Sequence, residues 1–439
     1  FCMLRNVPIW LSHLKDKGIE ELTRGFIQPR VARKSLCPLC RGVKLLCGKP
    51  ACPVTLQYYT FLRLEKYQNV DKIEGNSPPS IFVGRFGYPK VKVGPMVPPV
   101  RGDTSIYDYP EKWLDKSLEE ILELRSMLVH GRFSVHVKRP WEARREYDKM
   151  VEMSLSSTSP ETELIFEKRP TKTISFSKDV VLFGPSAPLK SFNLGTLKTD
   201  FRLERRHYDT DLRANEAVIE LYLDRVPISR IQRAFSVGSF GIEKNRRLVP
   251  TRWSITATDS IISQFLIDKI KYYPWMNECR VYENVTYDNV FVVLLIPSNW
   301  SYEWLEAWQP NTFWNRIGVD PVIYNDHEHF QGRTTYAYTG GCYYAARLAV
   351  AEKLEGMGRQ AAAILFREVH PGYLFPVGVW NVRENVRRAL SMSPKMFSTL
   401  NDALKYVVSR LTIPLKKWIH ASEYLHELLL QRKITEFTG

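Results

Sequence analysis

Four cysteines near the start of the chain are the residues whose types and spacing point most directly to chemistry. Two of them stand in the sequence Cys-Pro-Leu-Cys, and two more follow within fifteen residues of the first. Four thiolates around one ion make the closed tetrahedral arrangement of structural zinc. The alternative is a redox-active Cys-X-X-Cys pair, which does not need two further cysteines nearby. We therefore predict a structural Zn²⁺ site formed by Cys37, Cys40, Cys47 and Cys52.

The residues around these cysteines carry charge of one sign. Residues 22–64 contain no Asp or Glu, although the rest of the chain mixes both signs. A metal-held module with a basic surface is suited to contacts with a phosphate backbone. The alternative is a solvated basic surface beside an acidic part of the same protein. The residues that we expect to contact DNA here are Arg30, Arg33 and Lys34.

A second basic segment, residues 228–254, interleaves arginines with aromatic residues and flexible glycines. Gly238 and Gly241 permit a close backbone approach, and the aromatic side chains can stack on bases. The net charge of +15 also favours an anionic partner such as nucleic acid. The alternative is an ordinary turn whose arginines pair with carboxylates. The candidates for DNA contact in this segment are Lys244, Arg246, Arg247, Arg252 and Trp253.

The densest cluster of potential catalytic ligands is Asp326-His327-Glu328-His329. If this stretch is extended, the two carboxylates share one face of a strand and the two imidazoles share the other. Either pair could hold Mg²⁺ or Mn²⁺, and a bound metal activates water against phosphodiesters. The alternative is a polar surface loop that precedes a buried helix. These four residues are our candidates for catalysis, should the protein be an enzyme.

The last nine residues have the spacing of a peptide motif. Gln431, Ile434 and Phe437 recur every three residues, so a single 3₁₀ turn would place Ile434 and Phe437 on one side. This spacing resembles the motif by which replication and repair proteins bind the sliding clamp PCNA. Many such peptides carry two adjacent aromatic residues, whereas here Thr438 follows Phe437. The alternative is a frayed helix end whose apolar residues fold back on the protein.

Length and composition indicate a globular protein with several domains. The chain has 439 residues, 44% of them hydrophobic, and it contains neither a membrane-length apolar run nor a signal-peptide pattern. We expect a cytoplasmic protein without a membrane partner, in the mixed α/β (α+β) fold class. The expected parts are a zinc module (1–60), an α+β domain containing segment 228–254 (61–300), an α/β domain (301–392), a helical pair (393–430) and the clamp-binding tail (431–439).

Hydrophobic periodicity predicts individual elements within these parts. Alternating or continuous apolar runs predict strands at residues 132–138, 289–297 and 373–380. Helical spacing of apolar residues predicts helices at residues 109–130, 210–223, 259–272, 382–390, 398–411 and 415–430.

Three stretches carry a resemblance to a known family. They are SFGIEKNRRLVPTRWSIT (239–256), GRTTYAYTGGCYYAARLAVAEKL (332–354) and FPVGVWNVRENVR (375–387). In these stretches the chain resembles the archaeal Nre family of DNA-repair proteins, and the resemblance covers nearly its whole length. It implies a role in DNA repair with PCNA as partner, but it supplies no catalytic residues.

We therefore expect a DNA repair protein that binds DNA and is recruited to PCNA. Two classes of mechanism are open at this stage. The protein is either a non-catalytic DNA-binding adaptor or a metal-dependent nuclease that acts on damaged or branched DNA.

Overall fold

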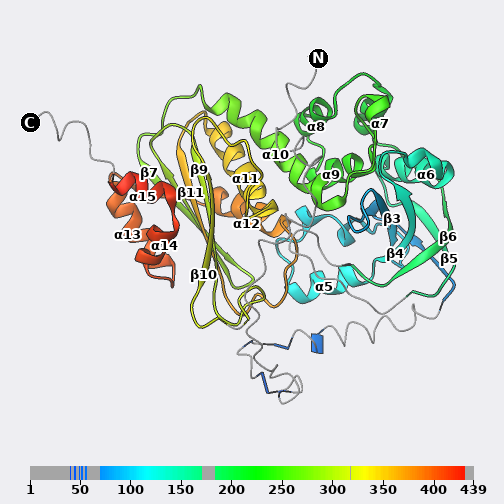
Figure 1. Ribbon diagram of the computed structural model, residues 1–439, viewed down its shortest axis with the longest axis horizontal. Coiled ribbons are helices and arrows are strands. Elements are labelled where there is room, and N and C mark those ends of the chain that lie inside the picture. The colour runs from blue at the N-terminus through cyan, green and yellow to red at the C-terminus, as the bar shows by residue number, and fades with distance from the viewer. Residues whose placement is uncertain are drawn as a thin grey trace, which may run out of the picture. The chain divides into compact units, whose positions relative to one another are not determined.

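The computed structural model describes residues 40, 44–45, 49, 51–52, 55–56, 70–170, 183–316 and 318–430. The chain forms two compact units, each described here by itself. The N-terminal unit comprises residues 51–266 and 374–384, and the C-terminal unit comprises residues 1–50, 267–373 and 385–439. Each unit contains one six-stranded sheet and several helices, so the mixed α and β class is confirmed (Figure 1). In the described ranges, no helix is long and apolar enough to cross a membrane.

The sheet of the N-terminal unit has the strand order β1-β5-β6-β4-β3-β2. All neighbouring strands are antiparallel except β4 and β6, which run parallel. In β3 the lysines at positions 90 and 92 are exposed and the valines at 91 and 93 are buried, as strand periodicity requires. The strands are β1 (Lys72–Asn76), β2 (Ser80–Val83), β3 (Lys90–Val97), β4 (Val129–His136), β5 (Glu161–Phe166) and β6 (Ser186–Leu194).

The helices of this unit begin at recognisable signals. Ser117 caps α5 through a reciprocal capping box with Glu120, and Asp200 caps α7 by accepting from the backbone of Arg202. Gly238 ends α9 in the left-handed conformation, with φ +76°. The helices are α5 (Leu118–Ser126), α6 (Arg144–Leu155), α7 (Phe201–Tyr208), α8 (Ala214–Leu223), α9 (Ile228–Val237) and α10 (Thr251–Ile270), with short 3₁₀ turns η4 (Ser105–Tyr107), η5 (Pro110–Lys112), η6 (Pro140–Ala143) and η7 (Glu243–Asn245).

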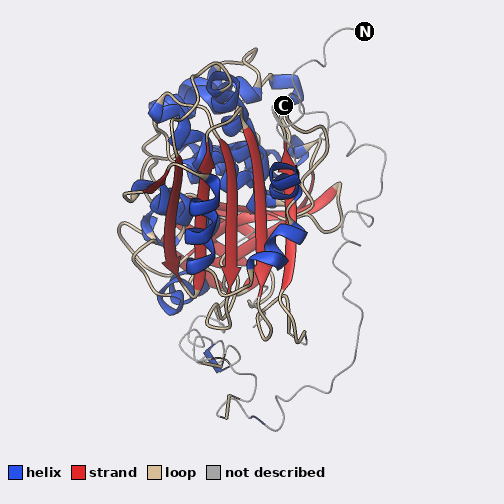
Figure 2. Cartoon of the chain, turned by 90° about the vertical axis from the view of Figure 1, so that its left-hand side faces the viewer, coloured by secondary structure: helices blue, strands red, loops and turns tan. Residues whose placement is uncertain are grey.

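The sheet of the C-terminal unit has the order β10-β9-β11-β8-β7-β12, and its strands lie side by side in Figure 2. Only β9 and β11 are parallel neighbours. Strand β8 is almost completely buried and confirms the strand expected at residues 289–297. The strands are β7 (Cys279–Thr286), β8 (Asn289–Ile296), β9 (Ser301–Trp308), β10 (Val322–Glu328), β11 (Ala362–Val369) and β12 (Lys395–Phe397).

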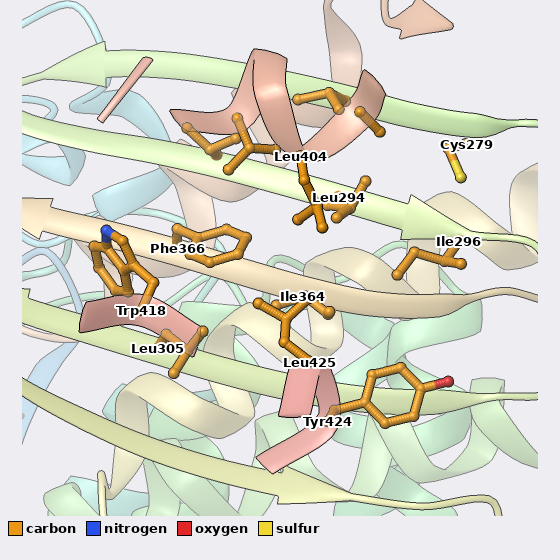
Figure 3. Close-up of a cluster of buried hydrophobic side chains, with 14 of the residues drawn as sticks. Cys279, Leu294, Ile296, Leu305, Ile364, Phe366, Leu404, Trp418, Tyr424 and Leu425 are labelled. Atoms are coloured by element: carbon orange, nitrogen blue, oxygen red, sulfur yellow. The ribbon is translucent and has the colours of Figure 1, made fainter. Parts of the chain in front are cut away.

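Helices cover both faces of this second sheet. Figure 1 shows α13 (Leu400–Arg410), α14 (Leu415–Ala421) and α15 (Glu423–Leu430) on one face and α11 (Gly341–Met357) on the other. Under the first group lies an apolar core in which Trp418 packs edge-on against Phe366, with ring centroids 5.3 Å apart (Figure 3). The expected helical C-terminal end is therefore confirmed, with the second helix divided at Ser422.

Two predicted elements are wrong in part or in whole. The strand expected at residues 373–380 is absent, because Pro376 and Gly378 interrupt it and α12 (Trp380–Ser391) begins there. The helix expected at residues 109–130 is shorter, since η5 precedes α5 and β4 begins at Val129.

Candidate nucleic-acid interface

The hairpin between β2 and β3 presents basic and aromatic side chains to solvent. Phe86 and Tyr88 are exposed at its tip, Phe86 to 81%. The guanidinium of Arg85 lies over the Phe86 ring, 5.0 Å from its centroid. Lys90 follows the turn and is exposed on the face that β3 turns away from the core. The hairpin tip therefore combines cations with uncovered aromatic rings.

The segment predicted to contact DNA, residues 228–254, divides into two structurally different halves. Its first half is α9, a buried helix, so its arginines lie inside the unit. Its second half reaches the hairpin, because Val83 N donates to Thr251 Oγ1 at 2.9 Å. The rings of Tyr88 and Trp253 lie 5.3 Å apart. Only the second half of the segment, ending at Trp253, therefore forms part of a surface.

The four basic candidates in this second half differ in what they contact. Lys244 and Arg247 are exposed. Arg246 donates to the carbonyl oxygens of Gly241 at 2.8 Å and His207 at 2.6 Å, so it ties the segment to the protein. Arg252 is half-buried and also interacts within the chain. Lys244 and Arg247 are therefore the candidates with side chains presented to solvent.

A third segment, which follows β4, joins the first two through backbone hydrogen bonds. Val137 N donates to Pro89 O at 2.9 Å, and Leu248 N donates to Val137 O at 3.0 Å. Trp141 in this segment is 55% exposed. We call segments 85–92, 136–142 and 243–253 together the basic-aromatic surface. They contain nine Lys and Arg residues but two Glu residues.

The basic-aromatic surface has the properties of a binding site for nucleic acid. Its lysines and arginines are able to contact phosphates, which supply affinity without sequence preference. Its exposed rings are able to stack on unpaired bases, since every base has a π-face. Sequence reasoning missed the hairpin part of this surface. The signal was present in the stretch Arg-Phe-Gly-Tyr-Pro-Lys-Val-Lys (85–92), where basic and aromatic residues flank a turn glycine.

The candidate catalytic cluster lies in the C-terminal unit, on β10. Asp326 lies in the extended chain of β10 and accepts from Arg333 Nη2 at 3.0 Å. It also accepts from the backbone nitrogen and the hydroxyl of Thr339, at 2.7 and 3.1 Å. With three donors on its oxygens, Asp326 fastens the loop before α11 to the sheet.

Glu328 is still more enclosed. Its carboxylate accepts from Arg347 Nη1 at 2.8 Å, Tyr343 Oη at 2.9 Å and Trp300 Nε1 at 3.1 Å. The pKa of Tyr343 is raised well above its usual value, mainly because the side chain is buried and secondly because Glu328 is negatively charged. Glu328 thus has charge-paired and hydrogen-bonded partners on both oxygens.

His327 lies in β10 and His329 directly follows its end, so the alternation of the extended chain turns both imidazoles away from the side of Asp326 and Glu328. The rings of His327 and His329 lie 5.2 Å apart, and His329 Nε2 is 3.6 Å from Glu427. Within the described residues, no group of three or more His, Cys, Asp or Glu side chains is arranged to hold a metal ion. Metal binding by these four residues stays a prediction.

Several predicted site residues lie outside the described residues. Of the zinc cysteines, Cys40 is described and buried and Cys52 is described and half-buried. The predicted site residues that lie outside the described ranges are Cys37 and Cys47 of the zinc set, the basic residues Arg30, Arg33 and Lys34, and the peptide residues Gln431, Ile434 and Phe437.

The comparison with known proteins decides the family. Residues 46–315 match the family described as Archaeal Nre, N-terminal, and residues 328–437 match Archaeal Nre, C-terminal. The chain belongs to the archaeal Nre family. The family resemblance of the three quoted stretches is thereby confirmed.

Three relatives in this family are similar over most of their length. DNA repair protein NreB of Archaeoglobus fulgidus is 42% identical over 91% of this chain and 99% of its own. DNA repair protein NreA of the same organism is 36% identical, over 87% of this chain and 95% of its own. DNA repair protein NreA of Haloferax volcanii is 32% identical, over 80% of this chain and 86% of its own. No solved structure matches this Nre chain.

The three family stretches take different places in this Nre protein. Stretch 239–256 supplies part of the basic-aromatic surface and the start of α10. Stretch 332–354 supplies Arg333, Tyr343 and Arg347, the partners of the two β10 carboxylates. Stretch 375–387 supplies Arg383, whose guanidinium pairs with Asp259 inside the N-terminal unit.

Proposed function

We propose that this Nre chain is a DNA repair protein that binds DNA and is recruited to PCNA through its C-terminal peptide. The observation that carries the proposal is similarity to three DNA repair proteins over most of both chains. Such coverage includes both units, so it concerns the whole protein rather than one shared module.

The basic-aromatic surface supports DNA binding by the N-terminal unit. Its cations are concentrated on three adjoining segments, and exposed rings lie among them. A phosphate backbone suits the cations and unpaired bases suit the rings, so single-stranded or distorted DNA is the expected ligand. Arg30, Arg33 and Lys34 are a second proposed contact in the N-terminal module.

The clamp partner is proposed from the spacing of Gln431, Ile434 and Phe437. The last described helix, α15, ends at Leu430, directly before this peptide. The match to the Nre C-terminal family runs to residue 437, so the family region includes all three motif positions. These observations support a clamp-binding peptide that directly follows α15 in the sequence.

Zinc is proposed as a structural cofactor of the N-terminal module, held by Cys37, Cys40, Cys47 and Cys52. The chemistry of four thiolates fits a closed tetrahedral ion and offers no open position for catalysis. Of these ligands, the buried Cys40 and the half-buried Cys52 lie among the residues that the structure describes.

Fluorescence anisotropy with labelled DNA tests the binding surface. A triple variant, Lys90→Ala/Lys92→Ala/Lys244→Ala, removes three exposed lysines of the basic-aromatic surface. We expect weaker binding to all sequences and a slope of log K against log salt that is shallower by about 2.

A matched control removes the same charge elsewhere in the unit. Lys168, Lys190 and Lys198 are exposed lysines outside the three segments, and their triple Ala variant has the same net charge. We expect this variant to bind nearly as well as the natural chain. Equal loss in both variants would mean that only net charge matters, and the surface assignment would fail.

A metal-dependent nuclease using Asp326 or Glu328 is the alternative function, and it has its own test. Labelled branched, nicked and single-stranded DNA is incubated with the protein, with and without Mg²⁺ or Mn²⁺. The hydrogen bonds that occupy both carboxylates favour a structural role, so we expect intact substrate in every lane.

A further inference from the structure

A cavity of about 70 Å³ lies inside the N-terminal unit, between elements that also carry the basic-aromatic surface. Phe82 of β2 and Thr251 of α10 line it, and these elements lead directly to the hairpin tip and to Trp253. One water molecule needs about 10–15 Å³ on the same measure, so there is room for roughly five waters or one small planar ring. The cavity is therefore large enough for a ligand group.

Every arginine that lines this cavity has a carboxylate partner. Arg125 and Arg233 both pair with Asp108, the latter at 3.2 Å. Arg383 pairs with Asp259 at 2.9 Å and with Glu384 at 3.0 Å. Three guanidinium groups are thus matched by three carboxylates. A phosphate or another anion would gain little here, so the cavity favours a neutral, hydrogen-bonding ligand.

Two buried side chains of the cavity wall have polar groups that are not satisfied by the protein. Among the described residues, Ser229 Oγ and Trp380 Nε1 have no hydrogen-bond partner, although Ser229 is 4% and Trp380 is 3% exposed. A buried polar group without a partner is unfavourable, because it has lost its hydrogen bonds to water. Both groups are able to donate, so a bound molecule with acceptor atoms would satisfy them.

The wall also provides flat apolar surface. The indole of Trp380 packs edge-on against Trp113, with centroids 5.1 Å apart, and Phe82 lines the cavity with it. Gln232 adds an amide, which donates to Asp259 at 3.2 Å. Aromatic walls with a few hydrogen-bonding groups are the usual surroundings of a small heterocyclic ligand.

We propose that this cavity receives a single unpaired nucleobase from nucleic acid bound to the basic-aromatic surface. The inference rests on the proposed DNA binding. A nucleobase is planar, neutral and rich in acceptors, which matches the shape, charge and unsatisfied donors of the cavity. Proteins that inspect or modify a base take it out of the stack, and the free-energy cost of doing so is smallest for mispaired bases.

Two of the family stretches meet at this cavity. Thr251 and Ile255 come from stretch 239–256, and Val379, Trp380 and Arg383 come from stretch 375–387. Residues more than a hundred positions apart in the sequence therefore build one wall. The cavity is therefore lined in part by two of the three stretches that carry the family resemblance.

The test uses thymidine as a probe and Ser229→Ala as the variant. The Ser229 hydroxyl has no partner among the described residues, whereas its backbone nitrogen keeps the bond to Glu111 Oε1 at 2.9 Å. The substitution therefore removes no hydrogen bond of the fold. We expect millimolar thymidine to raise the melting temperature of the natural chain by several degrees and that of Ser229→Ala by much less. Inorganic phosphate should give no such shift.

A second measurement connects the cavity with DNA. The natural chain should bind a duplex with one mispaired thymine several-fold more tightly than the fully paired duplex, and Trp380→Phe and Ser229→Ala should lose that preference. The Lys90→Ala/Lys92→Ala/Lys244→Ala variant should lose DNA affinity but keep the thymidine shift, which separates failure of the surface from failure of the cavity. No thymidine shift, or an undiminished one in Ser229→Ala, would overturn the proposal.

Discussion

Arg347 Nη1 lies 2.8 Å from Glu328 Oε2, and both side chains are almost completely shielded from water, with exposures of 3% and 1%. The pair joins the end of β10 to α11 inside the C-terminal unit. Tyr343 and Trp300 complete the hydrogen bonding of the carboxylate. A buried ion pair is costly to break, because removal of one partner leaves a charge without compensation.

The first prediction follows from this pair. Glu328→Ala should lower the free energy of unfolding by about 3–5 kcal/mol, because the buried guanidinium of Arg347 would lose the carboxylate of its ion pair. Glu427→Ala is the control, since this exposed glutamate near His329 should change stability by less than about 0.5 kcal/mol. Urea denaturation followed by tryptophan fluorescence measures both. A Glu328→Ala protein as stable as the control would contradict a structural role for Glu328.

Sequence reasoning left two forms of residues 326–329 open, an extended strand and a polar surface loop, and it gave no information on what their side chains contact. Alternation along a strand places Asp326 and Glu328 on one face. Whether arginines face them depends on Arg333 and Arg347, which arrive from the following loop and helix. Such contacts between distant parts of the chain are set by tertiary packing, and local periodicity contains no information about them.

The N-terminal unit shows the same difference between what local periodicity predicts and what tertiary packing determines. Periodicity located helix α8 and strand β4 to within a few residues. Segment 228–254 is predicted to contact nucleic acid, with arginines that pair with carboxylates as the alternative, and Arg230 and Arg233 follow the alternative because they are buried against Asp200 and Asp108. Charged residues on a buried helix are recognised only when their partners, far away in the sequence, are known.

The second prediction concerns acid stability and His130. Burial, aided by Arg132, lowers the pKa of His130 from 6.5 to about 3. Below pH 6.5 the unfolded chain therefore takes up a proton that the folded chain excludes, and stability falls as the pH decreases toward 3. The loss is about 1.4 kcal/mol per pH unit, or roughly 2 kcal/mol at pH 5. Urea denaturation between pH 7 and pH 5 measures it.

The variant His130→Phe isolates this contribution. A phenyl ring fits beside Phe82 and Phe183, whose rings lie 5.4 and 5.2 Å from the imidazole. Burial raises the pKa of Glu303 to about 7, which makes stability fall as the pH rises from 4.5 through 7. Because Glu303 acts equally in both proteins, the difference between them at each pH reports His130 alone. A difference that does not grow toward acid pH would refute the prediction.

The third prediction concerns zinc. Elemental analysis of the purified protein should give one zinc ion per chain, and Cys40→Ser should lose it because a three-thiolate site holds the ion less tightly. Cys279→Ala is the control, since Cys279 is a buried free cysteine of β7 outside the proposed ligand set. This control should retain zinc. A metal-free natural chain would rule out the zinc site, and full zinc occupancy in Cys40→Ser would exclude Cys40 as a ligand.

The fourth prediction concerns the C-terminal peptide. Deletion of residues 431–439 should abolish binding to PCNA but leave DNA affinity and melting temperature unchanged, because the peptide follows the end of α15 at Leu430. Phe437→Ala should account for most of the loss, since a buried aromatic anchor contributes about 2 kcal/mol or more to an interface. Ile434→Ala should cost less, and Thr438→Phe should strengthen binding by supplying the second aromatic residue. Calorimetric titration with PCNA ranks the four variants. If the truncated chain binds PCNA as tightly as the full chain, the spacing of Gln431, Ile434 and Phe437 is coincidental and the clamp contact lies elsewhere.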